Sequence, residues 1–333
     1  MNTDAKRISS DNITTYRVIA MTMVVLYHCT CYYAHPTWPF GEGPYNPILK
    51  ALTTLMGGIH MPVFVFISGY LFWMFKFQGK YTDVINFYKG KVLRIIVPYI
   101  CIGGGILLIF NEIYTPMVLL YGICHLWFLL MLFGVFVLAP ILWKIFENVK
   151  EDRLVTILVL SSFLIFPIFH SVNLLQVTKV FYFLPYFSFG YLLLRRGTKA
   201  LYTDWLFWTF LIVSMMGLYL ICPRSLFIDK VIRQYASMVV ILALALVPNF
   251  SIPEKVTGII NNISTNSMGI YLFHQVIVAQ LMMTSYIKLW LDTTNCYIGV
   301  IFLFMTTFCS SWIFSFACNR IRLTRLIIGS KIR

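Results

Sequence analysis

The sequence predicts an all-α, polytopic membrane protein of about ten transmembrane helices, with both termini in the cytoplasm. Hydrophobic residues make up 59% of the 333 residues and charged residues only 11%, whereas about a quarter of the residues of a soluble domain are charged. The apolar residues form runs of roughly 17–25 residues, the length that crosses a bilayer as a helix. Most Lys and Arg residues lie in the short segments on one side of these runs, as the positive-inside rule requires.

Ten apolar runs are long enough to be interpreted as spans, although Gly and Pro interrupt several of them. The connecting segments are too short for a separate soluble domain, so residues 1–333 are expected to form a single integral-membrane domain. The predicted spans are 13–34, 51–75, 94–113, 123–143, 154–170, 179–194, 205–222, 233–250, 266–290 and 296–319.

A cytoplasmic N-terminus places 20 of the 26 basic residues, Arg17 included, on the cytoplasmic side. The inside segments are then 1–12, 76–94, 144–153, 195–204, 251–265 and 320–333. The net charge of +14 therefore reflects topology, and no nucleic-acid partner is expected.

The first span carries two ionisable residues, Arg17 and His28. They lie eleven residues apart, which is close to three helical turns, so they share one face with a rise of roughly 16 Å between them. Ionisable groups inside a membrane are costly and mark functional sites. Arg17 is interpreted as an anchor near the cytoplasmic surface, and His28 as a reaction centre deeper in the bilayer, where a neutral imidazole suits a general base.

Two further cations, Lys91 and Arg94, enter the third span from the cytoplasmic side at i, i+3. Together with Arg17 they are suited to an anionic ligand, since the planar guanidinium matches a phosphate. Taken without Arg17, the pair is typical of ordinary flanking charge at the inside end of a span.

Three short strings stand out in the second, fourth and ninth spans. As isolated strings they are also explained by packing, by helix shaping at Pro62 and Gly69, or by an interfacial aromatic belt at Trp127. The strings are His60-Met61-Pro62-Val63-Phe64 running into Phe66-Ile67-Ser68-Gly69-Tyr70, then His125-Leu126-Trp127-Phe128-Leu129, and Ser267-Met268-Gly269-Ile270-Tyr271-Leu272-Phe273-His274.

Embedded acids are scarce, and Glu112, near the outer end of its span, is the exception. This scarcity argues against a two-carboxylate glycosidase, a carboxylate-bound di-metal site and a proton-coupled transporter. No metal is expected. Glu112 and Ser68 are candidate orienting partners for His28. The glycines at 103–105 form no phosphate-binding loop and are interpreted as a close helix contact.

Taken together, these strings resemble the acyltransferase-3 family of bacterial membrane acyltransferases. The family's pattern of Arg or Lys, ten residues and then His matches Arg17 and His28, and its two basic residues three apart match Lys91 and Arg94, with Lys in place of the commoner Arg. The strings "MPxFxFxSGYL", "HLWFL" and "SxGIYLxH" match Met61 to Leu71, His125 to Leu129 and Ser267 to His274. The resemblance covers the whole chain in order.

The resemblance implies an O-acyltransferase, most often an O-acetyltransferase, of the bacterial inner membrane. It implies acetyl-CoA as cytoplasmic acyl donor, with its anionic head near Arg17, Lys91 and Arg94. It also implies a glycan or lipid-linked sugar as acceptor at the outer face. His28 is the expected catalytic residue, acting either as general base or as acyl acceptor before relay. The expected substrate-binding residues are Ser68, Tyr70, His125, Trp127 and His274.

An exporter of polysaccharide or lipid-linked sugar is the alternative function, because ten spans also suit a permeation path. A line of cations leading to a deep histidine favours the enzyme. Neither the oligomeric state nor the identity of the acceptor sugar follows from the sequence.

Overall fold

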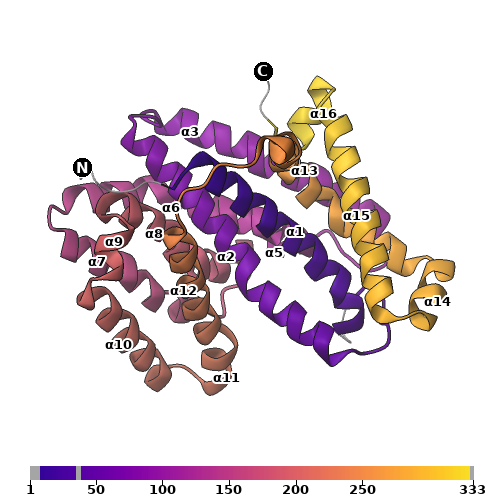
Figure 1. Ribbon diagram of the computed structural model, residues 1–333, viewed down its shortest axis with the longest axis horizontal. Coiled ribbons are helices and arrows are strands. Elements are labelled where there is room, and N and C mark those ends of the chain that lie inside the picture. Colours follow the sequence, from indigo (N-terminus) through magenta and orange to yellow (C-terminus); the bar gives the residue numbers. More distant parts are fainter. Residues whose placement is uncertain (1–7, 35–38, 331–333) are drawn as a thin grey trace.

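The computed structural model describes residues 8–34 and 39–330, and every regular element within these ranges is a helix (Figure 1). The all-α prediction is confirmed for this part of the chain. The α-helices are α1 (Ser10–Ala34), α2 (Pro47–Phe77), α3 (Val84–Lys91), α4 (Val97–Ile109), α5 (Val118–Tyr121), α6 (Trp127–Asn148), α7 (Asp152–Ser161), α8 (Val177–Arg196), α9 (Thr198–Tyr202), α10 (Trp205–Ile221), α11 (Arg224–Leu226), α12 (Ile232–Leu246), α13 (Glu254–Met283), α14 (Ser285–Thr293), α15 (Cys296–Cys318) and α16 (Arg322–Ile327). Short π-helical and 3₁₀ segments join them: η1 (Val92–Ile96), η2 (Cys124–Leu126), η3 (Ser162–Leu164), η4 (Phe166–Phe169), η5 (Leu174–Gln176) and η6 (Phe227–Val231).

The ten predicted apolar runs all fall mainly on helices, but six helical segments of the described chain are both long and apolar enough to cross a bilayer. The bent pair α13 and α14 gives a seventh if it forms one span. These findings support a multi-pass membrane protein, while the number ten and the orientation of the termini stay predictions. The six segments are Pro47–Phe77, Val84–Ile109, Cys124–Asn148, Asp152–Phe169, Leu174–Arg196 and Cys296–Cys318.

The predicted ninth span, 266–290, differs from the observed helix at both ends. Helix α13 already begins at Glu254 and ends at Met283, and α14 leaves it at an angle of 80°. The break lies at Thr284, whose backbone is extended (φ −73°, ψ 116°). The predicted span continues past Thr284 to Trp290, so its length gave no sign of the bend.

Helix α1 crosses the middle of the molecule (Figure 1). It packs against α2, α13 and α15. Buried residues such as Met21, Val24 and Val25 line its length. The face that carries Arg17 and His28 is therefore enclosed by other helices, where a polar side chain finds protein instead of lipid.

Side-chain caps fix where several helices begin. The Asn46 side chain accepts hydrogen bonds from the first free N–H groups of α2, and Asp83 and Asp204 do the same for α3 and α10. Such caps satisfy the backbone donors that a helix start leaves unpaired. The position at which α2 begins in turn fixes how far along the helix axis its motif residues His60 and Ser68 lie.

Helices α2 and α8 approach each other most closely at two glycines, Gly69 and Gly190. A Cβ atom on Gly69 would lie 2.4 Å from the carbonyl oxygen of Phe187, and one on Gly190 would lie 2.6 Å from the backbone nitrogen of Tyr70. One turn further, the indole N–H of Trp73 donates to the same Phe187 oxygen at 2.8 Å. Small residues let helices pack backbone to backbone in a membrane, and here they hold α2 in place.

The glycines at 103–105 were expected to make a close helix contact, and this prediction is wrong for two of them. No atom lies within 4 Å of a Cβ built on Gly104 or Gly105. Only Gly103 faces protein, at 3.0 Å from the side chain of Leu119. The tight contact is made instead by Gly69 and Gly190, which lie more than a hundred residues apart in the chain.

We expect Gly190→Ala to destabilise the protein by about 1–3 kcal/mol, because the added methyl group would overlap the backbone of α2. Thermal unfolding of the purified protein in detergent measures the loss. Gly105→Ala is the matched control, since its methyl group meets open space. Equal melting temperatures for the two variants would contradict the proposed role of the α2–α8 contact.

Candidate functional site

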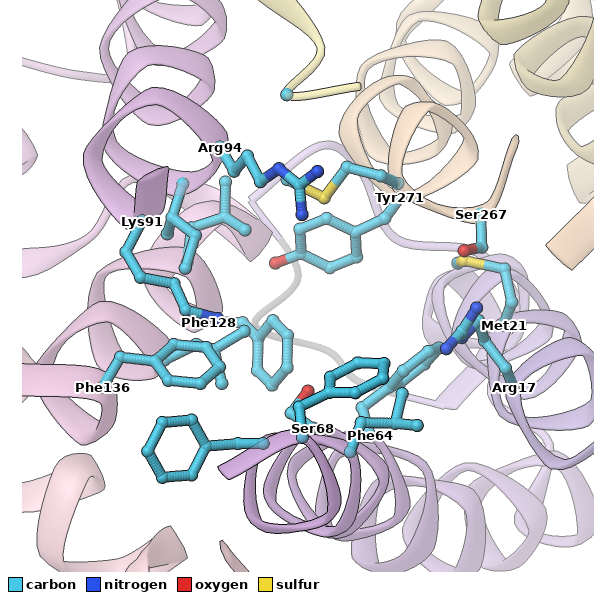
Figure 2. Close-up of a pocket in the computed structure, with 18 of the residues that line it drawn as sticks. Arg17, Met21, Phe64, Ser68, Lys91, Arg94, Phe128, Phe136, Ser267 and Tyr271 are labelled. Atoms are coloured by element: carbon cyan, nitrogen blue, oxygen red, sulfur yellow. The ribbon is translucent and has the colours of Figure 1, made fainter. Parts of the chain in front are cut away.

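A cavity of about 370 Å³ lies between α1, α2, α6, α13 and the segment that joins α3 to α4. Its wall contains Arg17, Lys91 and Arg94, and we call it the cation cavity. Figure 2 shows Lys91 and Arg94 on one side of it and Arg17 on the other, with Phe64 and Ser68 on α2. Most of the remaining lining is apolar and aromatic, including Phe128, Phe136 and Tyr271. The three cations predicted to act together do meet in one cavity.

None of these cations forms an ion pair with a carboxylate of the described residues. Within residues 8–34 and 39–330, the ion pairs join Arg195 to Asp152 and Arg196 to Asp204, away from this cavity. Arg17 donates to the Ser264 hydroxyl at 3.3 Å. The Lys91 ammonium lies 3.3 Å from the centre of the Phe136 ring. Arg17 and Lys91 are partly buried, whereas Arg94 is exposed. Partly buried cations without counter-charges are costly, and an anionic ligand would relieve that cost.

The local backbone explains how Lys91 and Arg94 reach the same cavity. The sequence placed the two residues three apart at the cytoplasmic entry to the third span. In the structure Lys91 ends α3 and Arg94 lies in the π-helical turn Val92–Ile96. Such turns insert a residue into an α-helix and occur often at functional sites. Both side chains still line the cavity.

A second cavity, of about 320 Å³, contains the predicted catalytic histidine. Its lining includes His28, His60, His125, Trp127 and Gln275, and we call it the histidine cavity. The ring of the fully buried His274 lies against it, 5.0 Å from the centre of the His28 ring and 4.8 Å from that of His125. Four histidines from α1, α2, η2 and α13 thus converge.

Backbone carbonyls fix the tautomers of three of these rings. A carbonyl only accepts, so the ring nitrogen beside it must carry the proton. His274 therefore donates from Nδ1 to the Tyr271 oxygen at 2.7 Å, His125 from Nε2 to the Leu272 oxygen at 3.2 Å, and His60 from Nδ1 to the Met56 oxygen. In each neutral ring the other nitrogen is an acceptor. The neighbours of His28 therefore each present a hydrogen-bond acceptor nitrogen.

In the part of the chain that the structure describes, no carboxylate lines the histidine cavity. Glu112, one candidate partner for His28, is exposed and lines neither cavity, and Ser68, the other, lies in the cation cavity. The residues around His28 that can receive a proton are other histidines. Among the described residues, no three His, Cys, Asp or Glu side chains are placed to hold a metal ion.

The predicted substrate-binding residues separate into three places. His125 and Trp127 line the histidine cavity and His274 lies beside it, whereas Ser68 lines the cation cavity. Tyr70 lines neither, and its buried hydroxyl accepts a hydrogen bond from the backbone of Ile8 at 2.9 Å. The structure thus brings three of the five together with His28, and their roles stay predictions.

Sequence reasoning did not single out Tyr271, which links the two cavities. It lines the cation cavity, and its ring centre lies 5.1 Å from that of His125 and 5.7 Å from that of Phe128. The signal was present, because Ser267, Tyr271 and His274 follow at i, i+4 and i+7 and so share one helix face.

The two cavities have no lining residue in common. The Phe128 and Tyr271 rings stand between them, and the Tyr271 hydroxyl donates to the backbone oxygen of His125. This aromatic wall separates the cations from the histidines.

Comparisons with known proteins give one positive result. The family model described as "Acyltransferase domain" matches residues 11–316, nearly the whole chain. No curated protein and no solved structure matches the chain. The matched range includes all the residues that line the histidine cavity and the cations Arg17, Lys91 and Arg94.

We expect Tyr271→Phe to destabilise the protein by about 1–3 kcal/mol, because the His125 carbonyl loses its buried donor. The loss is measured as a lower denaturation midpoint in detergent. Tyr286→Phe, at a residue that is 87% exposed, serves as control. If both substitutions leave the midpoint unchanged, the wall is not fixed by this hydrogen bond.

Proposed function

The chain belongs to the acyltransferase-3 family, and on this premise we propose that it is an O-acetyltransferase. The donor is cytoplasmic acetyl-CoA. The acceptor is a hydroxyl group of a cell-surface glycan or of a lipid-linked sugar at the outer face. The location that we propose is the inner membrane of a bacterium.

The observation that carries the proposal is that one helix joins the two cavities. Arg17 and His28 lie eleven residues apart on α1, roughly 16 Å along its axis. Arg17 lines the cation cavity and His28 the histidine cavity. A donor with an anionic head and a long neutral arm fits this arrangement, with its head at the cations and its thioester near the histidines.

The reaction breaks the thioester C–S bond and forms a C–O ester bond. In the direct route, the acceptor oxygen attacks the thioester carbonyl while His28 takes the hydroxyl proton. Collapse of the tetrahedral intermediate expels the CoA thiolate, which receives that proton and leaves as the thiol. In the alternative route, His28 itself attacks, and the acyl-imidazole is then transferred to the acceptor hydroxyl. Both routes use the same residue.

The histidines around His28 support either route. His274 presents an acceptor nitrogen on a ring whose centre lies 5.0 Å from that of His28, since its Nδ1 proton is held by the Tyr271 carbonyl. A neutral acceptor next to the base can take the place of the carboxylate that orients histidine in many hydrolases. We assign His274 and His125 to positioning, and Trp127 to the acceptor side.

The exporter alternative requires a path wide enough for a sugar. The Phe128–Tyr271 wall between the two cavities does not favour such a path, while an acyl group on a slender arm needs much less room. The transfer reaction therefore accounts for both the cations and the wall.

We expect His28→Ala to abolish acetyl transfer while the protein remains folded and inserted. Purified protein in liposomes is incubated with radiolabelled acetyl-CoA and candidate lipid-linked sugars, and acylated product is counted. The matched control is His170→Ala, because His170 is exposed and lines neither cavity. Full acylation by the His28 variant would exclude His28 as catalytic residue. Sugar efflux without transfer by the unchanged protein would favour the exporter.

We expect Arg17→Ala to raise KM for acetyl-CoA by about ten-fold or more with a smaller change in kcat, because it removes a charge-assisted contact to the donor's head. Steady-state kinetics at varied acetyl-CoA give both constants. Arg153→Ala, which removes an exposed cation near the predicted cytoplasmic surface, is the control and should leave KM unchanged. A loss confined to kcat would place Arg17 in the chemical step instead.

A further inference from the structure

A third cavity, of about 1,020 Å³, opens directly beside the cation cavity. The two share Arg17, Arg94, Ser267, Met268 and Gly329 in their walls. The rest of its lining is mostly polar, and we call it the arginine–asparagine cavity. Its volume lies at the upper end of the range of small-molecule sites. The further polar lining residues are Asn261, Asn262, Ser264, Thr265, Asn266, Asn319, Arg320, Arg325 and Ser330.

Two of its arginines, Arg320 and Arg325, lie beyond the last long helix and do not reach the cation cavity. The Arg325 Nε donates to the Asn319 carbonyl at 2.5 Å, which leaves the two Nη groups of the fork for another acceptor. The Arg320 guanidinium lies 4.7 Å from the centre of the Phe316 ring. Neither forms an ion pair with any described residue, and no Asp or Glu lines the cavity.

The position of this C-terminal segment is fixed by specific contacts. Gly329 has a positive φ of 68°, and a Cβ there would lie 2.4 Å from the Arg94 carbonyl oxygen, so the segment sits directly on η1. On the other side, the Asn319 amide donates to the Asn266 side chain at 2.8 Å, and Ser315 donates to the same oxygen. The arginines are thus held in place over the cation cavity.

We propose that Arg320 and Arg325 bind the 3′-phosphate of the CoA nucleotide. Arg17 and Arg94, which line both cavities, bind its diphosphate. This inference rests on the proposed function, because it takes acyl-CoA as the donor. It extends that function by naming the group that distinguishes CoA from a shorter pantetheine thioester.

The order of chemistry along the two cavities matches the order of groups in CoA. The pantetheine arm is neutral and slender, and the cation cavity is lined mainly by apolar and aromatic side chains. The diphosphate follows the arm, and Arg17 and Arg94 stand where the two cavities meet. The nucleotide and its 3′-phosphate dianion come last, and the arginine–asparagine cavity offers amide groups and two further guanidinium forks.

Ordinary positive-inside charge is the competing explanation for these arginines. It predicts that all cations of the segment act alike, through net charge alone. Arg322 provides the contrast, because it lies between them in the sequence, is exposed and does not line the cavity. If the site is specific, substitution of Arg320 and Arg325 weakens binding of the 3′-phosphate, whereas substitution of Arg322 does not.

The experiment measures the dissociation constants of CoA and of dephospho-CoA, which lacks the 3′-phosphate, for the full-length protein in nanodiscs. We expect the unchanged protein to bind CoA about ten-fold more tightly than dephospho-CoA, since charge-assisted hydrogen bonds are lost with the phosphate. The double variant Arg320→Gln/Arg325→Gln should bind both ligands with the dephospho-CoA affinity of the unchanged protein. Arg322→Gln should keep the ten-fold preference.

The outcomes separate the inference from the function on which it rests. No binding of either ligand by the unchanged protein would overturn the acyl-CoA donor itself. Equal binding of the two ligands, or an unchanged preference in the double variant, would overturn the phosphate site and leave the donor intact. A loss of preference in Arg322→Gln as large as in the double variant would assign the effect to net charge and overturn the site. Unchanged dephospho-CoA binding in the double variant shows that this variant is folded. If the double variant is unstable, Arg320→Gln alone repeats the test, because this substitution breaks no hydrogen bond within the described chain.

Discussion

The cost of a charged or polar group inside a bilayer shapes this molecule around helix α1. A cation and an imidazole on one helix face are tolerable in a membrane only where protein or a cavity surrounds them. Helices α2, α13 and α15 provide that surrounding. They enclose the face completely enough to leave two separate cavities, one for each group, instead of a single channel. The site is therefore a consequence of how α1 is enclosed.

Enclosure requires helices that hold together without help from the hydrophobic effect, since lipid tails are as apolar as the side chains they replace. Helix α2 shows how this is achieved. Gly69 and Gly190 let α2 and α8 meet backbone to backbone, and Trp73 adds a hydrogen bond across the contact. The same α2 contributes Ser68 to the cation cavity and His60 to the histidine cavity. The packing that stabilises the fold also sets the relative depth of the two sites.

Helical periodicity explains which parts of the site could be predicted from the sequence. Arg17 and His28 lie close to three turns apart, so a straight helix was enough to place both on one face. The same rule, applied to the "SGY" string, shows that Ser68 and Tyr70 point to nearly opposite sides, since two residues correspond to about 200° of rotation. Ser68 lines a cavity, while Tyr70 reaches the backbone of Ile8.

Contacts between helices far apart in the chain could not be predicted in this way. The convergence of His28, His125 and His274 depends on how α1, η2 and α13 pack, and no spacing in one sequence encodes that. The π-helical turn at Arg94 and the bend at Thr284 were hidden as well, because the length and spacing of apolar runs do not report local backbone geometry. The family match agrees with the ordered motifs, each of which is short and uninformative by itself.

Under the proposed function, the separation of the two cavities gives a physical reason why a small acyl group would be the species that crosses the membrane. The phosphates of an acyl-CoA would remain in the cytoplasmic half, because moving them toward the histidines would strip them of both water and the arginines. The Phe128–Tyr271 wall then has to admit only an uncharged arm and its thioester. Since Tyr271 also holds the His125 carbonyl and its own carbonyl orients His274, parting the wall would move the residues next to His28. Under the proposed function, a donor that reaches this wall would act on the histidines through Tyr271, whose hydroxyl contacts His125 and whose backbone carbonyl contacts His274.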